Sequence, residues 1–220
     1  MTGRPAAAVL PAALRGCLGL VAVLAALMVV VLGVLYAGHS EPGRVDRWVV
    51  DPTADRVRQP WRGVALAVDF LGEPAGAALL VMAAVTGLLL LRRPRAAVLA
   101  VAGAATAVGT ATLLKHLVGR TIHGAGNLSY PSGHTAFLTA VALIAALLAA
   151  GRLGLGGAAG LSLVLTAALV AGAAMGWAQV ALGAHYPTDV LGGCCTALAV
   201  IPATAWLIDR TATLLRRAGR

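Results

Sequence analysis

The chain has 220 residues, of which 60% are hydrophobic and only 11% are charged. Soluble domains usually carry about 25% charged residues, so this composition excludes an ordinary soluble protein and indicates one integral membrane domain over residues 1–220. The formal net charge is +9, but the arginines form short clusters between apolar runs. That pattern is typical of membrane topology and not of nucleic-acid binding.

Six apolar segments in chain order have about the length needed to cross a bilayer. They cover residues 17–36, 74–91, 96–114, 134–150, 161–182 and 189–208. Residues 39–62, between the first two, combine nearly balanced charge with tryptophans, so we expect them to lie on the membrane surface. A surface helix to about Leu71 follows. The predicted fold class is all-α, a polytopic membrane protein with a six-transmembrane-helix bundle.

An even number of spans puts both termini on the same side of the membrane. Ten arginines then fall on that side: Arg4, Arg15, Arg92, Arg93, Arg95, Arg152, Arg210, Arg216, Arg217 and Arg220. By the positive-inside rule this side is the cytoplasm. We therefore expect a multi-pass protein of the plasma membrane with both termini cytoplasmic.

A short polar turn, residues 130–135, precedes the fourth apolar segment. Pro131 and Gly133 interrupt any preceding helix, and Ser132 is suited to cap a helix that begins near His134. The helix N-terminus and the unobstructed backbone of the glycine suit an anion. The turn is therefore a candidate anion-binding site.

The predicted topology brings a set of polar residues to the outer membrane face. They are Lys115, Arg120, His123, Ser132, His134, His185 and Asp189. Ionisable residues at membrane depth are costly and tend to be functional. We therefore predict that the active site faces the outer side.

These residue types favour phosphate chemistry. Lys115 is the only lysine of the chain, and with Arg120 it can form a cationic cradle beside the turn. His185 and Asp189 are four residues apart, so on a helix they share a face. The carboxylate can then hold one imidazole nitrogen protonated and leave the other free to attack. With His134 as the acid, the set favours phosphoryl transfer through a phosphohistidine over acyl transfer.

Simpler explanations exist for each residue alone, as a helix cap, a surface side chain or a headgroup anchor, and only the joint pattern favours a site. A metal site of His134, His185 and Asp189 is the main chemical rival. No His-x-x-x-His or His-Glu-x-x-His spacing supports it, and the neighbouring cations would repel a metal. We therefore expect no metal and no cofactor.

Two motifs, residues 131–134 (Pro-Ser-Gly-His) and 185–189 (His-Tyr-Pro-Thr-Asp), resemble those of the type 2 phosphatidic acid phosphatase family. Its members are membrane lipid phosphate phosphatases, with soluble relatives among the acid phosphatases and vanadium haloperoxidases. The resemblance covers roughly residues 96–205. It implies a six-helix membrane fold and metal-independent cleavage of a lipid phosphate ester or anhydride.

The resemblance also implies roles for single residues. His185 would be the nucleophile, Asp189 would orient it, and His134 would protonate the leaving group. The phosphate would be held by Lys115, Ser132 and the backbone of Gly133.

Two arginines of the family pattern are replaced in this chain. Ile122 and Gln179 occupy their positions, and His123 stands where the family has a proline. Arg120 is close enough in sequence to replace one arginine, Gln179 can still donate a hydrogen bond, and a His123 imidazolium can supply charge. We therefore add Arg120, His123 and Gln179 to the predicted phosphate-binding residues.

The predicted function is hydrolysis of a lipid phosphomonoester or diphosphate. The candidate substrates are polyprenyl phosphates or diphosphates, phosphatidylglycerol phosphate and phosphatidic acid. The alternative is a weakened relative that binds or translocates a lipid phosphate without hydrolysis, as the replaced arginines suggest. The expected partners are the lipid substrate and membrane lipids, with no nucleic acid.

Overall fold

The computed structural model describes residues 8–53 and 57–218. Arg4 and Arg220, which the topology prediction used, lie outside the described residues. A short 3-10 helix, η1 (Ala12–Leu14), precedes the α-helices. These are α1 (Arg15–Leu35), α2 (Arg44–Thr53), α3 (Trp61–Phe70), α4 (Pro74–Leu90), α5 (Pro94–Val118), α6 (Gly133–Leu153), α7 (Gly157–Ala181) and α8 (Pro187–Ala218).

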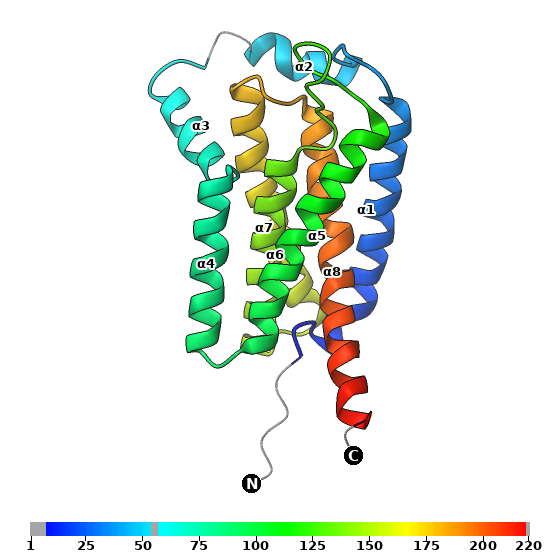
Figure 1. The fold of residues 1–220 in the computed structure, drawn as a ribbon, viewed down its shortest axis with the longest axis vertical. Coiled ribbons are helices and arrows are strands. Elements are labelled where there is room, and N and C mark those ends of the chain that lie inside the picture. The colour runs from blue at the N-terminus through cyan, green and yellow to red at the C-terminus, as the bar shows by residue number, and fades with distance from the viewer. Residues whose placement is uncertain (1–7, 54–56, 219–220) are drawn as a thin grey trace.

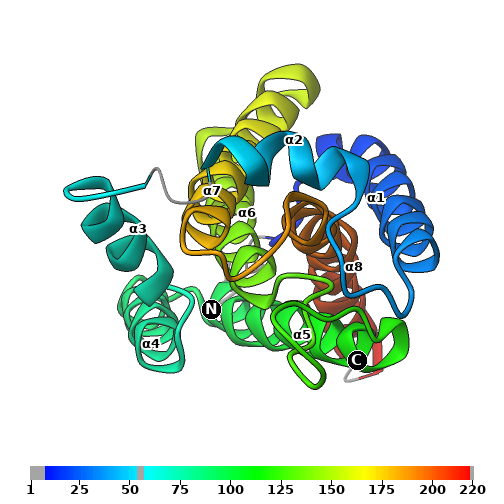
Figure 2. The ribbon, with the colours of Figure 1, turned by 90° about the horizontal axis from the view of Figure 1, so that it is seen from above.

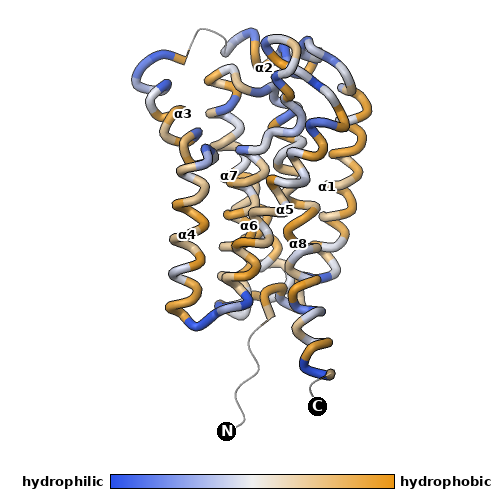
Figure 3. Tube along the Cα trace, in the orientation of Figure 1, coloured by the Kyte–Doolittle hydropathy of each residue, from blue (hydrophilic) through white to orange (hydrophobic). Residues whose placement is uncertain are grey.

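Five stretches of helix within the described residues are long and apolar enough to cross a membrane: η1 with α1, and α5, α6, α7 and α8. Helices α3 and α4 pass the same test together, although they are bent by 59° at the break between them. Figure 3 shows hydrophobic residues along the middle of the bundle and hydrophilic residues gathered at its two ends. The prediction of an all-helical, polytopic membrane protein is confirmed.

The core of the bundle is formed by α5, α6, α7 and α8, which pack against one another. Helix α1 packs on α8, α4 packs on α5, and α3 packs on α7. Figure 2 shows α3 and α4 set to one side of this core, and α2 lying across the end of the bundle. The apolar centre contains Leu14, Leu18, Leu99, Leu143, Leu147, Val164 and Ile201, all buried.

The break between α3 and α4 depends on two residues at the start of α4. Pro74 occupies the first turn, where its missing N–H needs no helical partner. Gly76 follows, and a Cβ at this position would lie 1.9 Å from the carbonyl oxygen of Phe70. A larger residue would therefore push the two helices apart.

Predicted and observed helix boundaries differ mainly at the ends of α5 and α8. Helix α5 continues to Val118, so the predicted end of the third segment at Lys115 lies within its last turn. Helix α8 continues past Ile208 to Ala218. The charged residues after Ile208 do not end the helix where it leaves the apolar layer. Buried Asp209 anchors this last part of α8 because it accepts hydrogen bonds from the backbone N–H groups of Val9 and Leu10.

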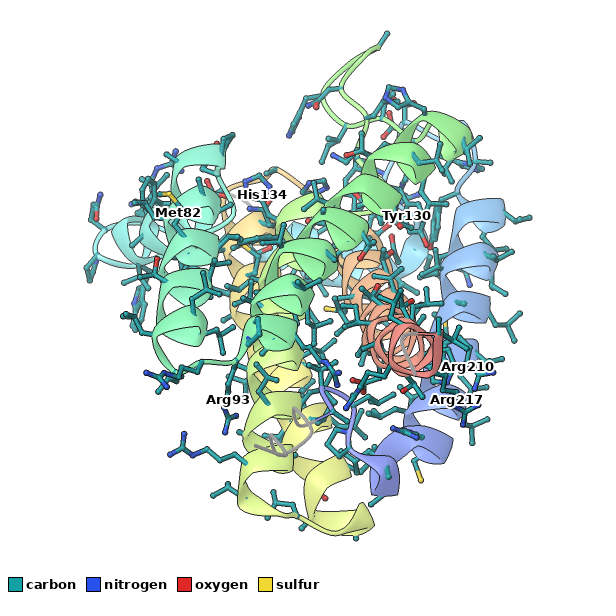
Figure 4. The ribbon with its side chains drawn as sticks, turned by 60° about the horizontal axis from the view of Figure 1, so that its bottom comes forward. Met82, Arg93, Tyr130, His134, Arg210 and Arg217 are labelled. Carbon is teal, nitrogen blue, oxygen red and sulfur yellow. The ribbon has the colours of Figure 1, made fainter. Side chains whose placement is uncertain are left out.

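Figure 1 shows the start of α1 and the end of α8 at one end of the bundle, which we call the terminal end. Arg93, Arg210 and Arg217 lie toward this end in Figure 4. The turn at residues 130–135 and helix α2 lie at the opposite end, which we call the site end.

Candidate active site

The two predicted catalytic motifs meet at the site end, at the N-termini of α6 and α8. His134 is the second residue of α6, and Asp189 lies in the first turn of α8. His185 precedes α8 in the short link from α7. The backbone N–H of Ser132 donates to the backbone carbonyl of Asp189 at 2.9 Å, which fixes one motif against the other.

His185 is positioned as a neutral base or nucleophile. Its side chain is 8% exposed, and its Nδ1 faces Asp189 Oδ2 at 3.6 Å. Burial lowers the pKa of His185 because it disfavours the charged imidazolium, and the charges of Lys115 and His134 lower it further, while Asp189 opposes the shift. A lowered pKa keeps the imidazole neutral, the form that can attack.

Asp189 is fully buried, and contacts on both of its oxygens fix its carboxylate. Its Oδ1 accepts a hydrogen bond from Arg120 Nη1 at 2.6 Å, and its Oδ2 accepts one from the backbone N–H of Tyr186 at 3.0 Å. The same Oδ2 faces His185. Asp189 therefore links the imidazole to Arg120.

We call the buried group around Arg120 the Arg120 network: Asp46, Arg120, Thr188 and Asp189. Arg120 also donates to Thr188 Oγ1 at 2.6 Å and to Asp46 Oδ2 at 2.7 Å. Its guanidinium lies over two aromatic rings, 4.1 Å from the centroid of Tyr36 and 4.7 Å from that of Tyr186.

These contacts bear on the prediction that Arg120 binds phosphate. Its side chain is 0% exposed, and two carboxylates already occupy its terminal nitrogens. The guanidinium therefore holds Asp189 in place and does not face an open cradle. Direct phosphate binding by Arg120 stays a prediction that these contacts do not favour.

Ser132 and Gly133 form the turn before α6, and they differ in what they offer a ligand. Ser132 caps α6 as predicted, since its Oγ accepts hydrogen bonds from the backbone N–H of Thr135 at 3.4 Å and from Thr135 Oγ1 at 3.0 Å. It is fully buried. Gly133 is partly exposed, and a Cβ there would meet nothing within 4 Å. Its backbone is therefore open to approach, whereas the Ser132 hydroxyl is engaged inside the turn.

We call the group around His134 the His134 cluster: Asp69, Glu73, His134 and Gln179. His134 Nε2 lies 3.6 Å from Asp69 Oδ1 and 3.5 Å from Glu73 Oε1. Gln179 donates through Nε2 to the same Asp69 oxygen. Figure 4 shows His134 on α6 beside the break between α3 and α4, the segment that supplies both acids.

The remaining predicted phosphate ligands lie around these two clusters. Lys115 is partly buried, and its Nζ donates to the carbonyl of Leu128 at 3.0 Å. His123 is exposed, and its Nε2 lies 2.7 Å from the carbonyl oxygen of Gly183. His123, His185 and Arg62 line one cavity of about 300 Å³.

Four polar residues of this region were not predicted as part of the site: Asp46, Arg62, Asp69 and Glu73. Asp69 and Glu73 were visible in the sequence as acids that interrupt an apolar stretch, which was the only available signal. Asp46 and Arg62 lie in the surface segment, and nothing in their sequence neighbourhood indicates a contact with residues far along the chain.

An apolar groove opens below His134. It lies between α4, α5 and α6 and has a volume of about 310 Å³, with Val81, Leu88, Ile144 and Leu148 among the side chains that line it. It begins about two helical turns along α6 from His134 and continues toward the terminal end. A hydrocarbon chain attached to a group at the site would find an apolar surface here.

Comparisons with known proteins agree with this geometry. The family model described as PAP2 superfamily matches residues 72–212. The fold is similar to the crystal structure of a transmembrane PAP2 type phosphatidylglycerolphosphate phosphatase from Bacillus subtilis, with 22% sequence identity and a TM-score of 0.65 over 85% of this chain and 93% of that chain. No curated protein sequence matches the chain. The structural likeness shows a shared fold, and the family match covers both motifs.

Proposed function

The chain belongs to the PAP2 superfamily of membrane phosphatases, and from this membership we propose that it hydrolyses a lipid phosphomonoester or diphosphate at the outer face of the plasma membrane. The observation that carries the proposal is the meeting of His134, His185 and Asp189 at the site end. There, His185 is buried against Asp189, and the hydrogen bond from the backbone N–H of Ser132 to the carbonyl of Asp189 holds the turn before His134 against the same residue.

The geometry supports a two-step mechanism. His185 attacks the phosphorus through Nε2 while Asp189 holds Nδ1, so an N–P bond forms as the P–O bond to the lipid breaks. The departing oxygen takes a proton from His134. Water then attacks the phosphohistidine, gives up a proton to His134 and releases phosphate. Lys115 and the open backbone at Gly133 stabilise the charge on the phosphoryl oxygens.

A lipid substrate is favoured by the apolar groove below His134. A chain lying between α4 and α6 would leave its phosphate level with the N-terminus of α6. The phosphatidylglycerolphosphate phosphatase of similar fold suggests one candidate headgroup. Polyprenyl phosphates or diphosphates and phosphatidic acid remain candidates of the same chemical class.

The outer-face orientation rests on charge asymmetry between the two ends of the bundle. The terminal end carries the arginine cluster before α5 and the arginines at the end of α8, with Asp209 the only acid in those two stretches. At the site end the cations are accompanied by acids. The positive-inside rule therefore favours a cytoplasmic position for the terminal end.

Phosphate release by the purified protein tests the proposal. In detergent with EDTA and no added metal, the wild type should release phosphate from at least one lipid of a panel that covers the candidate classes. His185→Asn should not, and wild type quenched in denaturant at alkaline pH, where the N–P bond is stable, should carry a phosphohistidine that this variant lacks. Equal release by the two proteins would refute the assigned nucleophile.

A second candidate function is lipid phosphate binding without turnover. The observation that favours it is Gln179, which takes the place of a family arginine and is bonded to the carboxylate of Asp69. Saturable lipid phosphate binding that persists in His134→Ala, with no release of phosphate from any lipid of the panel, would support this function over hydrolysis.

A further inference from the structure

Asp69, Glu73 and His134 converge from three different elements. Asp69 is near the end of α3, Glu73 is the residue before α4, and His134 is in the first turn of α6. One ligand atom from each, two carboxylate oxygens and one imidazole nitrogen, lie within 4.8 Å of one another. The convergence depends on the 59° bend between α3 and α4.

The spacing of these atoms is too wide for hydrogen bonds and suits a cation. His134 Nε2 is buried and has no hydrogen-bond partner, although two carboxylate oxygens lie 3.5 and 3.6 Å away. Metal–ligand bonds of about 2.0–2.2 Å at tetrahedral angles separate neighbouring ligand atoms by about 3.3–3.6 Å. The Asp69 and Glu73 oxygens lie within 4.8 Å of each other, so a shift of the half-exposed Glu73 side chain would let a metal ion contact all three groups.

The surroundings of the cluster resemble the outer shell of a metal site. Gln179 donates a hydrogen bond to Asp69 Oδ1, which orients the carboxylate and leaves lone pairs free. Gly72 lies against the imidazole, and a Cβ there would come within 2.4 Å of His134 Cδ2. Within the described residues, no lysine or arginine forms a salt bridge with Asp69 or Glu73. The two negative charges are therefore left for another cation.

We propose that Asp69, Glu73 and His134 bind one divalent transition-metal ion of the Zn²⁺ type. The donor set is one imidazole and two carboxylates, which suits a borderline cation better than Mg²⁺, which prefers an all-oxygen octahedral shell. A metal on His134 Nε2 occupies the atom that protonates the leaving group. Binding therefore inhibits the reaction reversibly, and this consequence rests on the proposed function, whereas the binding itself does not.

Calorimetric titration of ZnCl₂ into metal-stripped full-length protein in detergent tests the binding. The wild type should bind one ion per chain, and Glu73→Gln and Asp69→Asn should each weaken the affinity by at least about tenfold. Glu41→Gln is the matched control, because Glu41 is an exposed glutamate outside both clusters, and it should bind like the wild type. Wild-type affinity in both cluster variants would overturn the proposal, and so would equal competition by Mg²⁺.

A second measurement separates the metal site from the proposed function. Zn²⁺ should inhibit lipid phosphate hydrolysis by the wild type and by Glu41→Gln, EDTA should reverse the inhibition, and Glu73→Gln should need at least about tenfold more Zn²⁺. If the wild type binds Zn²⁺ at this cluster but hydrolyses nothing, the proposed function fails and the metal site stands. If it hydrolyses lipids and binds no Zn²⁺, the metal site fails alone. Because Glu73 is half exposed, folding of its variant is not at risk.

Discussion

The Arg120 network and the His134 cluster lie at the same end of the bundle, and they differ in how their charged groups are paired. Arg120 is fully buried and bonded to two buried carboxylates and a hydroxyl. His134 is 28% exposed, and its Nε2 faces two carboxylates that it does not reach. A buried network whose charged groups are paired stabilises one arrangement, even though Arg120 Nε has no hydrogen-bond partner among the described residues. A cluster whose imidazole nitrogen is unpaired remains open to a proton, a substrate or an ion. The first is therefore the frame of the site, and the second is its reactive part.

Asp189 belongs to the Arg120 network but also faces the nucleophile His185, so changing it gives the strongest test of the distinction between frame and reactive part. Asp189→Asn keeps the shape of the side chain but removes the negative charge that faces His185. We expect kcat to fall by about 10³–10⁴-fold, as in other enzymes where a carboxylate orients a catalytic histidine. Steady-state phosphate release measures the effect.

The matched control is Asp209→Asn, at the other end of the same helix. Asp209 is also a buried carboxylate and accepts two backbone hydrogen bonds, from Val9 and Leu10. Its variant should lose stability and keep its turnover number. A similar fall in kcat in both variants would mean that the Asp189 effect is structural.

Arg120→Met should destabilise the fold more than any change in the His134 cluster. It leaves Asp46 and Asp189 buried without their cation, which costs about 3–5 kcal/mol. Glu73→Gln changes a half-exposed residue and should alter stability by less than about 0.5 kcal/mol. Thermal unfolding of the two variants in the same detergent compares them. If Arg120→Met unfolds like the wild type and only its KM for the lipid rises, Arg120 is a phosphate ligand after all.

The extent to which the sequence predicted each cluster follows from how local its contacts are. The spans and the Ser132 cap depend on hydrophobic runs and neighbouring residues, and both were predicted. The pairing of His185 with Asp189 was predicted from helical spacing, and it forms although His185 lies in the link before α8. The Arg120 network was not, because Asp46 reaches Thr188 across 142 residues of chain. The His134 cluster was also missed, since Asp69 and Glu73 meet His134 only through the bend between α3 and α4, and no sequence pattern gives that angle.

His134→Gln should slow the reaction in a way that depends on the leaving group. If His134 protonates the departing oxygen, its loss costs about a hundredfold with an alkyl phosphate lipid. A lipid with an activated aryl phosphate needs no proton from the enzyme and should lose much less. Single-turnover rates with the two substrates measure the difference. An equal loss with both would assign His134 to positioning and not to acid catalysis.

On the acidic limb of the pH–rate profile, the rate should fall at a lower pH than it would if the nucleophile had the pKa of an ordinary histidine. The nucleophile must be neutral, and burial lowers the pKa of His185 below its usual value of about 6.5. The rate is therefore retained down to a pH below 6.5 and is lost as the pH falls through the lowered pKa. Lys115→Met removes a charge that lowers this pKa, so its acid limb should move upward, whatever happens to the maximal rate. A limb that stays fixed in the variant would place Lys115 away from the nucleophile.

Gly72→Ala has the smallest expected effect and tests how His134 is held. No hydrogen bond fixes Nε2, so the position of the ring depends on the space left by Gly72, where a Cβ would lie 2.4 Å from His134 Cδ2. We expect kcat to fall about fivefold, equivalent to about 1 kcal/mol of crowding, with little change in KM. Gly109→Ala on α5 is the control, since a Cβ there meets nothing within 4 Å and the position does not line the apolar groove. If Gly72→Ala keeps the wild-type kcat, the imidazole adjusts freely and the His134 cluster is held by its charges. If kcat falls as expected and Arg120→Met lowers stability, then packing positions the His134 cluster, whereas charge pairing stabilises the Arg120 network.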